Sequence, residues 1–97
     1  MWILQSADPD VTFSIRPGAV KAIGRAGGAQ LILDAPLVSR VHCRIEAGDE
    51  RLEVVDLHST NGTFVNDTRV ERAWLLDGDR LRVGRVELMV QRGSDPD

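Results

Sequence analysis

The sequence predicts an all-β protein, a β-sandwich of two mainly antiparallel sheets or a barrel. Apolar and polar residues alternate with a period of two over residues 11–15 and 41–47, as in strands that bury one face. Clusters of glycine, proline, asparagine and aspartate interrupt the apolar runs at intervals of roughly eight to twelve residues, which is typical of sandwiches and barrels. No stretch keeps a helical period, so helix content should be near zero.

About ten short strands are expected along the chain. They cover residues 2–5, 11–15, 19–23, 31–33, 41–47, 51–57, 64–65, 69–70, 79–84 and 86–90. Turn residues such as Pro17-Gly18 and Asp77-Gly78 separate them. The turns at 48–50, 66–68 and 77–78 predict hairpins, so the strands should be mostly antiparallel, and alternate residues of two facing sheets should fill one core.

Length and composition favour one small domain. The 97 residues should form a single domain over 1–92, followed by a polar tail or linker over 93–97. A net charge of −3 argues against nucleic acid as a partner. Cys43 is the only cysteine, which excludes an intrachain disulfide and fits a reducing, cytoplasmic compartment. The apolar run at 1–4 is too short for a signal peptide or a membrane span, and a monomer is the default state.

Three polar loops interrupt this strand pattern. They cover residues 24–28, 37–41 and 59–63. The first carries Arg25 beside glycines, the second Ser39-Arg40, and the third the hydroxyl and amide groups of Ser59-Thr60-Asn61 before Gly62. Binding residues concentrate on loops that a rigid scaffold holds, so these loops form the candidate binding site.

The order of these motifs resembles a forkhead-associated (FHA) domain over about residues 11–90. The segments that carry the resemblance are Ile23-Gly24-Arg25, Ser39-Arg40-Val41-His42, Asp56-Leu57, Ser59-Thr60-Asn61-Gly62-Thr63, Val65-Asn66, Leu76-Asp77-Gly78-Asp79 and Gly84. A Gly-Arg pair or a Ser-x-x-His motif alone would be weak. Together with Ser-Thr-Asn-Gly-Thr, at fitting spacing, they are specific.

The resemblance implies a β-sandwich whose loops at one end bind a phosphothreonine peptide of a partner protein in Ser/Thr kinase signalling. By this resemblance, Arg25 and Ser39 bind the phosphate, Arg40 and Thr60 also contact it, and Asn61 bonds the peptide backbone. The residue types agree, because a phosphate dianion needs several donors fixed in advance.

The resemblance also implies supporting roles. His42 should be structural and hold the binding loops, while Gly24, Gly62 and Asn66 should shape the site through turns. Asp67 stands where the family commonly has glycine, and aspartate tolerates the left-handed conformation that such a turn needs.

Two further expectations concern apolar side chains. The loop before Ser39 offers Leu37 and Val38, which the resemblance places near the third residue after the phosphothreonine. Trp74 should pack in the core beside Leu75-Leu76, since a large ring next to apolar neighbours more often packs than binds.

Other functions are less well supported by the sequence. Asp56, His58 and Ser59 could suggest catalysis, but they lack the context of a nucleophile elbow. His42 and Cys43 are adjacent on a strand and would point to opposite faces, so no metal site is expected. The loop 24–28 lacks the end of a nucleotide-binding P-loop. We therefore expect no enzyme and no cofactor.

One alternative stays open. Taken singly, Arg25 could be an ordinary surface cation, Ser39 a turn residue and Asn61 a loop residue with positive φ. The same sandwich could also serve as a scaffold that assembles proteins without phosphate. The presence of Arg25, Ser39, Thr60 and Asn61 together favours phosphate-dependent binding.

Overall fold

The computed structural model describes residues 1–93 and contains eleven strands and no helix in that range. The strands are β1 (Trp2–Ala7), β2 (Asp10–Ile15), β3 (Val20–Gly24), β4 (Leu31–Ile32), β5 (Cys43–Ala47), β6 (Leu52–Asp56), β7 (Thr63–Val65), β8 (Thr68–Val70), β9 (Arg72–Leu75), β10 (Arg80–Val83) and β11 (Val86–Arg92). The tail predicted over 93–97 lies, beyond Gly93, outside the described residues.

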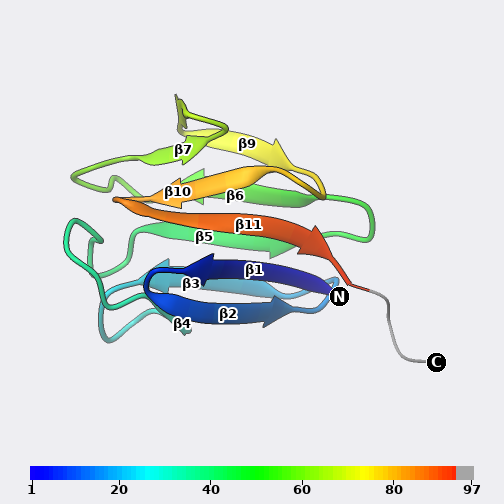
Figure 1. The fold of residues 1–97 in the computed structure, drawn as a ribbon, viewed down its shortest axis with the longest axis horizontal. Helices are drawn as coiled ribbons and strands as arrows, with labels where there is room; N and C mark the ends of the chain where they lie inside the picture. The colour runs from blue at the N-terminus through cyan, green and yellow to red at the C-terminus, as the bar shows by residue number, and fades with distance from the viewer. Residues whose placement is uncertain (94–97) are drawn as a thin grey trace.

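The strands form two facing sheets (Figure 1). One sheet has the order β2-β1-β11-β10-β7-β8, and the other has the order β4-β3-β5-β6-β9. Only β3 and β4 pair in parallel within the described chain; the other pairs are antiparallel. The hairpins predicted at the turns 48–50 and 66–68 are present as β5–β6 and β7–β8. The turn at 77–78 instead joins β9 to β10, which lie in different sheets, so the hairpin predicted there is wrong; β10 pairs with β11 through a turn at 84–85. The predicted fold class is therefore confirmed.

Alternate residues of both sheets fill the core, as the period of two predicts. On β5 and β6 the inward residues are Cys43, Ile45, Ala47, Leu52 and Val54. Those on β1, β10 and β11 are Trp2, Leu4, Leu81, Val83, Val86, Leu88 and Val90. The Trp2 ring packs in this core and its Nε1–H donates to the Gly48 carbonyl oxygen at 2.8 Å, so the β5–β6 turn is joined to β1.

The expectation for Trp74 was wrong. Trp74 lies on β9, a strand that the sequence analysis did not predict, and its side chain points outward with 51 % exposure. Leu75 takes the inward position, because neighbouring residues of a strand face opposite sides of the sheet. The Arg51 guanidinium lies 3.6 Å from the centroid of the Trp74 ring and covers part of it.

The turn at Asn66-Asp67 shows how side chains shape the loops. Both residues have positive φ, 48° and 70°, as a two-residue type I′ hairpin requires. Asn66 Oδ1 accepts the Arg80 N–H at 2.9 Å, and Asn66 Nδ2 donates to Asp79 Oδ1 at 3.1 Å. Asn66 thus joins the β7–β8 turn to the start of β10, and aspartate serves at the second position without glycine.

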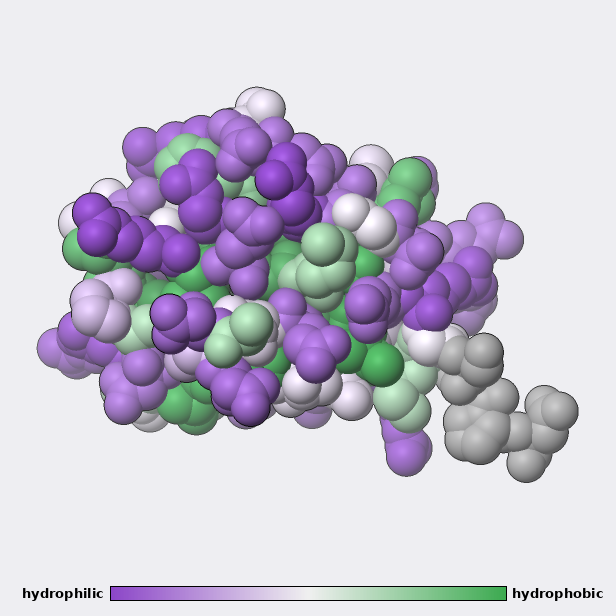
Figure 2. Space-filling model, in the orientation of Figure 1, coloured by the Kyte–Doolittle hydropathy of each residue, from purple (hydrophilic) through white to green (hydrophobic). Residues whose placement is uncertain are grey.

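The two ends of the sandwich differ. The N-terminus lies beside Gly93, whose N–H donates to the Met1 carbonyl oxygen at 2.8 Å, and the three polar loops lie at the opposite end (Figure 1). On the face that Figure 2 shows, hydrophilic side chains predominate, with small apolar patches between them. Within residues 1–93 there is no helix long and apolar enough to span a membrane.

Candidate functional site

Backbone hydrogen bonds hold the first two polar loops against each other. The Arg25 N–H donates to the Ser39 carbonyl oxygen at 2.9 Å, and the His42 N–H donates to the Ile23 carbonyl oxygen at 2.8 Å. A Cβ on Gly24 would overlap the Arg40 carbonyl oxygen, so only glycine permits this close approach. Arg25 and Ser39, fourteen positions apart in the sequence, therefore lie on neighbouring loop backbones.

His42 joins the second and third loops from inside the protein. Its ring is fully buried; Nδ1 accepts the Ser39 N–H at 3.1 Å, and Nε2 lies 2.8 Å from the Gly62 carbonyl oxygen. A backbone N–H can only donate, so Nδ1 has no proton and Nε2 carries it and donates to Gly62. The neutral imidazole in this tautomer satisfies one group of each loop and fixes the distance between them.

Asp56, at the end of β6, organises the third loop. Its Oδ1 accepts the hydroxyls of Ser59 at 2.6 Å and Thr63 at 2.7 Å, and its Oδ2 accepts the Ser59 N–H at 3.1 Å. Ser59 Oγ in turn accepts the Gly62 N–H at 3.0 Å. Burial raises the pKa of Asp56, but the hydrogen bonds from Ser59 and Thr63 outweigh burial and the pKa is lowered. The charged carboxylate thus holds a compact turn.

This network was not expected from the sequence. The local signal was the Asp-x-x-Ser spacing of Asp56 and Ser59, because aspartate and serine side chains at such spacing bond nearby backbone groups. The contact to Thr63 had no local signal, since Thr63 belongs to β7 in the other sheet.

The residues of the rejected catalytic and metal sites have other surroundings. Cys43 is fully buried, and this burial, together with the nearby charge of Asp56, raises the pKa of its thiol to about 12, so the thiol is protonated and unreactive. His58 is exposed and has a positive φ of 56°. In residues 1–93 no group of three or more acidic, histidine or cysteine side chains is placed to hold a metal ion.

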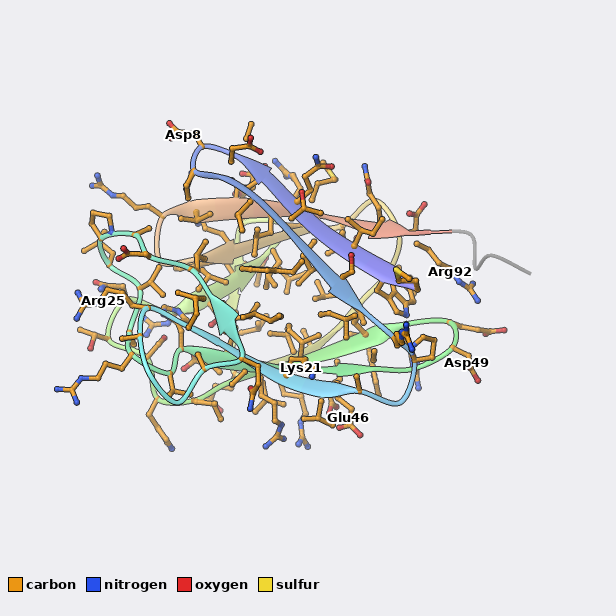
Figure 3. All side chains as sticks on the ribbon, turned by 90° about the horizontal axis from the view of Figure 1, so that it is seen from below. Asp8, Lys21, Arg25, Glu46, Asp49 and Arg92 are labelled. Carbon is orange, nitrogen blue, oxygen red and sulfur yellow. The ribbon has the colours of Figure 1, made fainter. Side chains whose placement is uncertain are left out.

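The predicted binding residues gather at this end of the sandwich, with several polar groups unused. Ser39 Oγ accepts the Thr60 N–H at 3.2 Å, which leaves the Ser39 proton to be donated outward. Asn61 Nδ2 donates to the Leu37 carbonyl oxygen at 3.2 Å and leaves Oδ1 as a free acceptor. The exposed guanidinium of Arg25 makes no hydrogen bond or ion pair with residues 1–93; Figure 3 shows it at the end away from Asp49 and Arg92. Arg40, next to Ser39, is also exposed and unpaired there.

The two apolar residues before Ser39 differ in their exposure. Leu37 is 40 % exposed and has a positive φ of 71°. Val38 is only 3 % exposed and packs in the core, so the expectation that it faces a ligand was wrong. The positive φ at Leu37 turns the chain so that successive side chains separate, one outward and one inward.

Arg69 is a residue at this end that the sequence analysis missed. A Cβ on Gly62 would lie 3.0 Å from Arg69 Nε, so the guanidinium packs directly on the third loop. The β7–β8 register, in which Phe64 pairs with Arg69, produces this position.

Comparison with known proteins gives consistent results. The sequence model of the FHA domain matches residues 22–84. The chain is 40 % identical over 80 residues to the FHA domain-containing protein FhaA of Mycobacterium tuberculosis, covering 82 % of this chain and 15 % of FhaA. It is 35 % identical over 75 residues to the glycogen accumulation regulator GarA of M. tuberculosis, covering 77 % of this chain and 46 % of GarA. This chain therefore spans less than half the length of either relative.

Solved structures share the fold. The FHA domain of FhaA, complexed with the intracellular domain of Rv3910, has a TM-score of 0.84 and 38 % identity, covering 94 % of this chain and all of that one. An FHA domain from an analysis of phosphothreonine-dependent FHA interactions has a TM-score of 0.86 and 37 % identity, covering 97 % and 98 %. The overall fold of this chain is thus similar to that of these FHA domains.

Proposed function

Because the chain belongs to the FHA domain family, we propose that it is a phosphothreonine-binding module that captures phosphorylated partner proteins in Ser/Thr kinase signalling. The observation that carries this proposal is the group of unused hydrogen-bond donors at the end of the sandwich where the three polar loops lie. There the unused donors of Arg25 and Ser39 lie on neighbouring backbones, and the Ser39 hydroxyl also bonds the loop that carries Thr60 and Asn61. Donors from three loops suit an anion with several oxygens.

The supporting hydrogen bonds suit this function because they order the donors before the ligand arrives. His42 joins the second and third loops, Asp56 orders the third, and the Arg25–Ser39 backbone bond holds the first against the second, so fewer groups must be immobilised during binding. Each side chain that is ordered only on binding costs roughly 0.5–1.5 kcal/mol. In this proposal Arg25, Ser39, Arg40 and Thr60 contact the phosphate and Asn61 bonds the peptide backbone.

A binding module accounts for the site better than an enzyme. Ser59 donates its hydroxyl proton to Asp56 with no histidine between them, and the Cys43 thiol is buried and protonated. The proposal assigns the whole function to a single domain over residues 1–92, acting in the cytoplasm, where Ser/Thr kinases supply phosphorylated partners. No cofactor is needed for binding of this kind.

The second candidate is assembly without phosphate on the same fold. It predicts that phosphorylated and unphosphorylated peptides bind equally. The unpaired cationic and hydroxyl groups at the loop end favour the phosphate-dependent function, since a phosphate-free interface has no need for them.

Phosphopeptide titration tests the proposal. Arg25→Ala should weaken binding of a phosphothreonine peptide by about a hundredfold or more, because a charged hydrogen bond contributes about 1.5–3 kcal/mol and a guanidinium can form two. Arg25→Lys should restore little, because lysine lacks the planar fork. Ser39→Ala removes one such bond and should weaken phosphopeptide binding about tenfold to a hundredfold.

The matched control is Arg16→Ala, since Arg16 is an exposed arginine next to the turn bonded to Ala47, at the far end of the sandwich. Melting temperatures verify folding of all variants. Full binding by a folded Arg25→Ala protein, or equal binding of the unphosphorylated peptide by the wild type, would overturn the proposal.

A further inference from the structure

Arg69 lies in a row of side chains that begins at the third polar loop. Phe64 pairs with Arg69 on β8 and with Arg82 on β10, and directly paired residues of antiparallel strands share one face of the sheet. The Arg82 guanidinium lies 4.1 Å from the centroid of the Phe64 ring. A Cβ on Gly62 would lie 3.2 Å from both the Phe64 ring and the Arg69 guanidinium carbon. Phe64 and Arg69 therefore pack against the third polar loop.

The charge of Arg69 is not neutralised by the protein. Its exposed guanidinium makes no hydrogen bond or ion pair with residues 1–93. Two other arginines are ion-paired, Arg80 with Asp67 at 3.3 Å and Arg72 with Glu53 at 3.4 Å, whereas Arg82 lies over the Phe64 ring. Asp56 and Glu71 line the same surface hollow as Arg69, but neither forms an ion pair with it. Arg69 therefore presents a free positive charge beside the binding loops.

The backbone groups of Gly62 are already hydrogen-bonded within the protein and are not available to a ligand. Its N–H donates to Ser59 Oγ, and its carbonyl oxygen accepts the proton on His42 Nε2. It has no side chain, and the packing of Arg69 against it leaves the guanidinium as the adjacent polar group. A peptide held by Ser39 and Thr60 that continues past Gly62 would meet Arg69.

We propose that Arg69 binds an acidic group of the ligand, a carboxylate or a second phosphate, on the flank of the phosphothreonine that passes Gly62. This inference rests on the proposed function of the same site and adds a sequence preference to it. The guanidinium suits both kinds of acid because its planar fork matches the geometry of carboxylate and phosphate oxygens. Its packing on Gly62 limits its freedom before the ligand binds.

The test is a charge scan of a phosphothreonine peptide with uncharged flanks. Glutamate replaces each flanking residue in turn, and fluorescence anisotropy gives the dissociation constants. At positions on one side of the phosphothreonine, glutamate should strengthen binding about two- to fivefold, the upper part of the range of an exposed ion pair. A second phosphorylated residue at the responding position should strengthen binding about tenfold and distinguishes the two sources of acid. Added salt should reduce either gain.

Three variants assign any gain to Arg69. Arg69→Gln should abolish the gain from glutamate, so that this variant binds the glutamate peptide and the uncharged parent peptide with equal affinity. Arg69→Glu should reverse the preference, so that lysine at the responding position binds better than glutamate. Arg16→Gln removes the same charge at the far end of the sandwich and should keep the full gain.

The outcomes separate this inference from the proposed function. If the wild type binds the parent phosphopeptide but no acidic substitution helps, or if Arg69→Gln keeps the gain, the assignment of Arg69 is wrong and the phosphothreonine site stands. If no phosphothreonine peptide binds better than its unphosphorylated form, both fail. Melting temperatures of the variants show whether an altered affinity reflects folding.

Discussion

Replacement of His42 by alanine tests whether the buried ring sets the geometry of the binding loops. The ring bonds the Ser39 N–H at 3.1 Å and the Gly62 carbonyl oxygen at 2.8 Å, and it is fully buried. In His42→Ala both backbone groups lose their partners, at about 1–3 kcal/mol each. We expect a loss of about 3–5 kcal/mol in the free energy of unfolding. In a domain of this size, 3 kcal/mol lowers Tm by roughly 12–24 °C.

The same change should weaken phosphopeptide binding in molecules that remain folded. Without the ring, the Ser39 and Thr60 donors must be ordered by the ligand, at about 0.5–1.5 kcal/mol each. Two such costs, about 1–3 kcal/mol together, correspond to a loss of affinity of roughly fivefold to a hundredfold. Calorimetric titration well below the Tm of the variant measures this loss separately from unfolding.

Leu52→Ala is the matched control. Leu52 is fully buried on β6 beside the turn at the far end of the sandwich, and its truncation should cost about 2–5 kcal/mol. It should therefore lower Tm by a similar amount and leave the dissociation constant unchanged. If folded His42→Ala binds the phosphopeptide as tightly as Leu52→Ala does, the ring contributes only to stability and the reasoning is refuted.

Four further predictions follow from the same site. Because the pKa of Asp56 is lowered in the folded protein, its carboxylate stabilises the fold above its unfolded pKa of about 3.9, and this stabilisation is lost as pH falls through the lower folded value. Asp56→Asn should thus lower Tm near neutral pH, with the difference shrinking in acid; a gap that stays constant with pH would contradict this. Gly24→Ala should lower the free energy of unfolding by about 1–3 kcal/mol and weaken peptide binding, because the new Cβ would overlap the Arg40 backbone. Gly27→Ala should be tolerated because a Cβ there meets no other atom, and urea denaturation measures both changes in stability. Phosphothreonine should bind several-fold better than phosphoserine in matched peptides, since burial of a methyl group contributes about 0.8 kcal/mol. An aliphatic residue should be preferred to an acidic one at the third position after phosphothreonine, where Leu37 offers no charge; enrichment of acidic residues in a peptide library would count against it.

Local sequence patterns were sufficient for most of the strands and for the place of the binding loops. The alternation predicted over residues 41–47 holds over 43–47 and gave the buried face of β5, although Val41 and the buried His42 precede that strand. The turn residues Asn66 and Asp67 both tolerate the positive φ of the β7–β8 hairpin. The spacing of Arg25, Ser39 and Thr60 between strands was enough to place them on separate loops. These features depend on neighbours within a few residues, which the sequence shows directly.

Exposure was less predictable where the local pattern was ambiguous. Trp74, Leu75 and Leu76 are consecutive apolar residues, so the sequence cannot say which of them faces inward. The register of β9 with β6, where Glu53 pairs with Trp74 and Leu52 with Leu75, directs Leu75 inward and Trp74 outward. Leu37 and Val38 are a similar case, decided by the positive φ of Leu37.

The sequence alone therefore determined that this chain forms a β-sandwich and which loops carry its polar groups. Only the tertiary structure decided how those loops are held and what lies beside them: the bonds of His42 to both loops, the contact of Asp56 with Thr63, and the packing of Arg69 on Gly62. Propensities and turn signals act over a few neighbouring residues. The partners of a buried side chain instead depend on which strands pair and in what register. Strand pairing and register are determined together when the two sheets pack around one core.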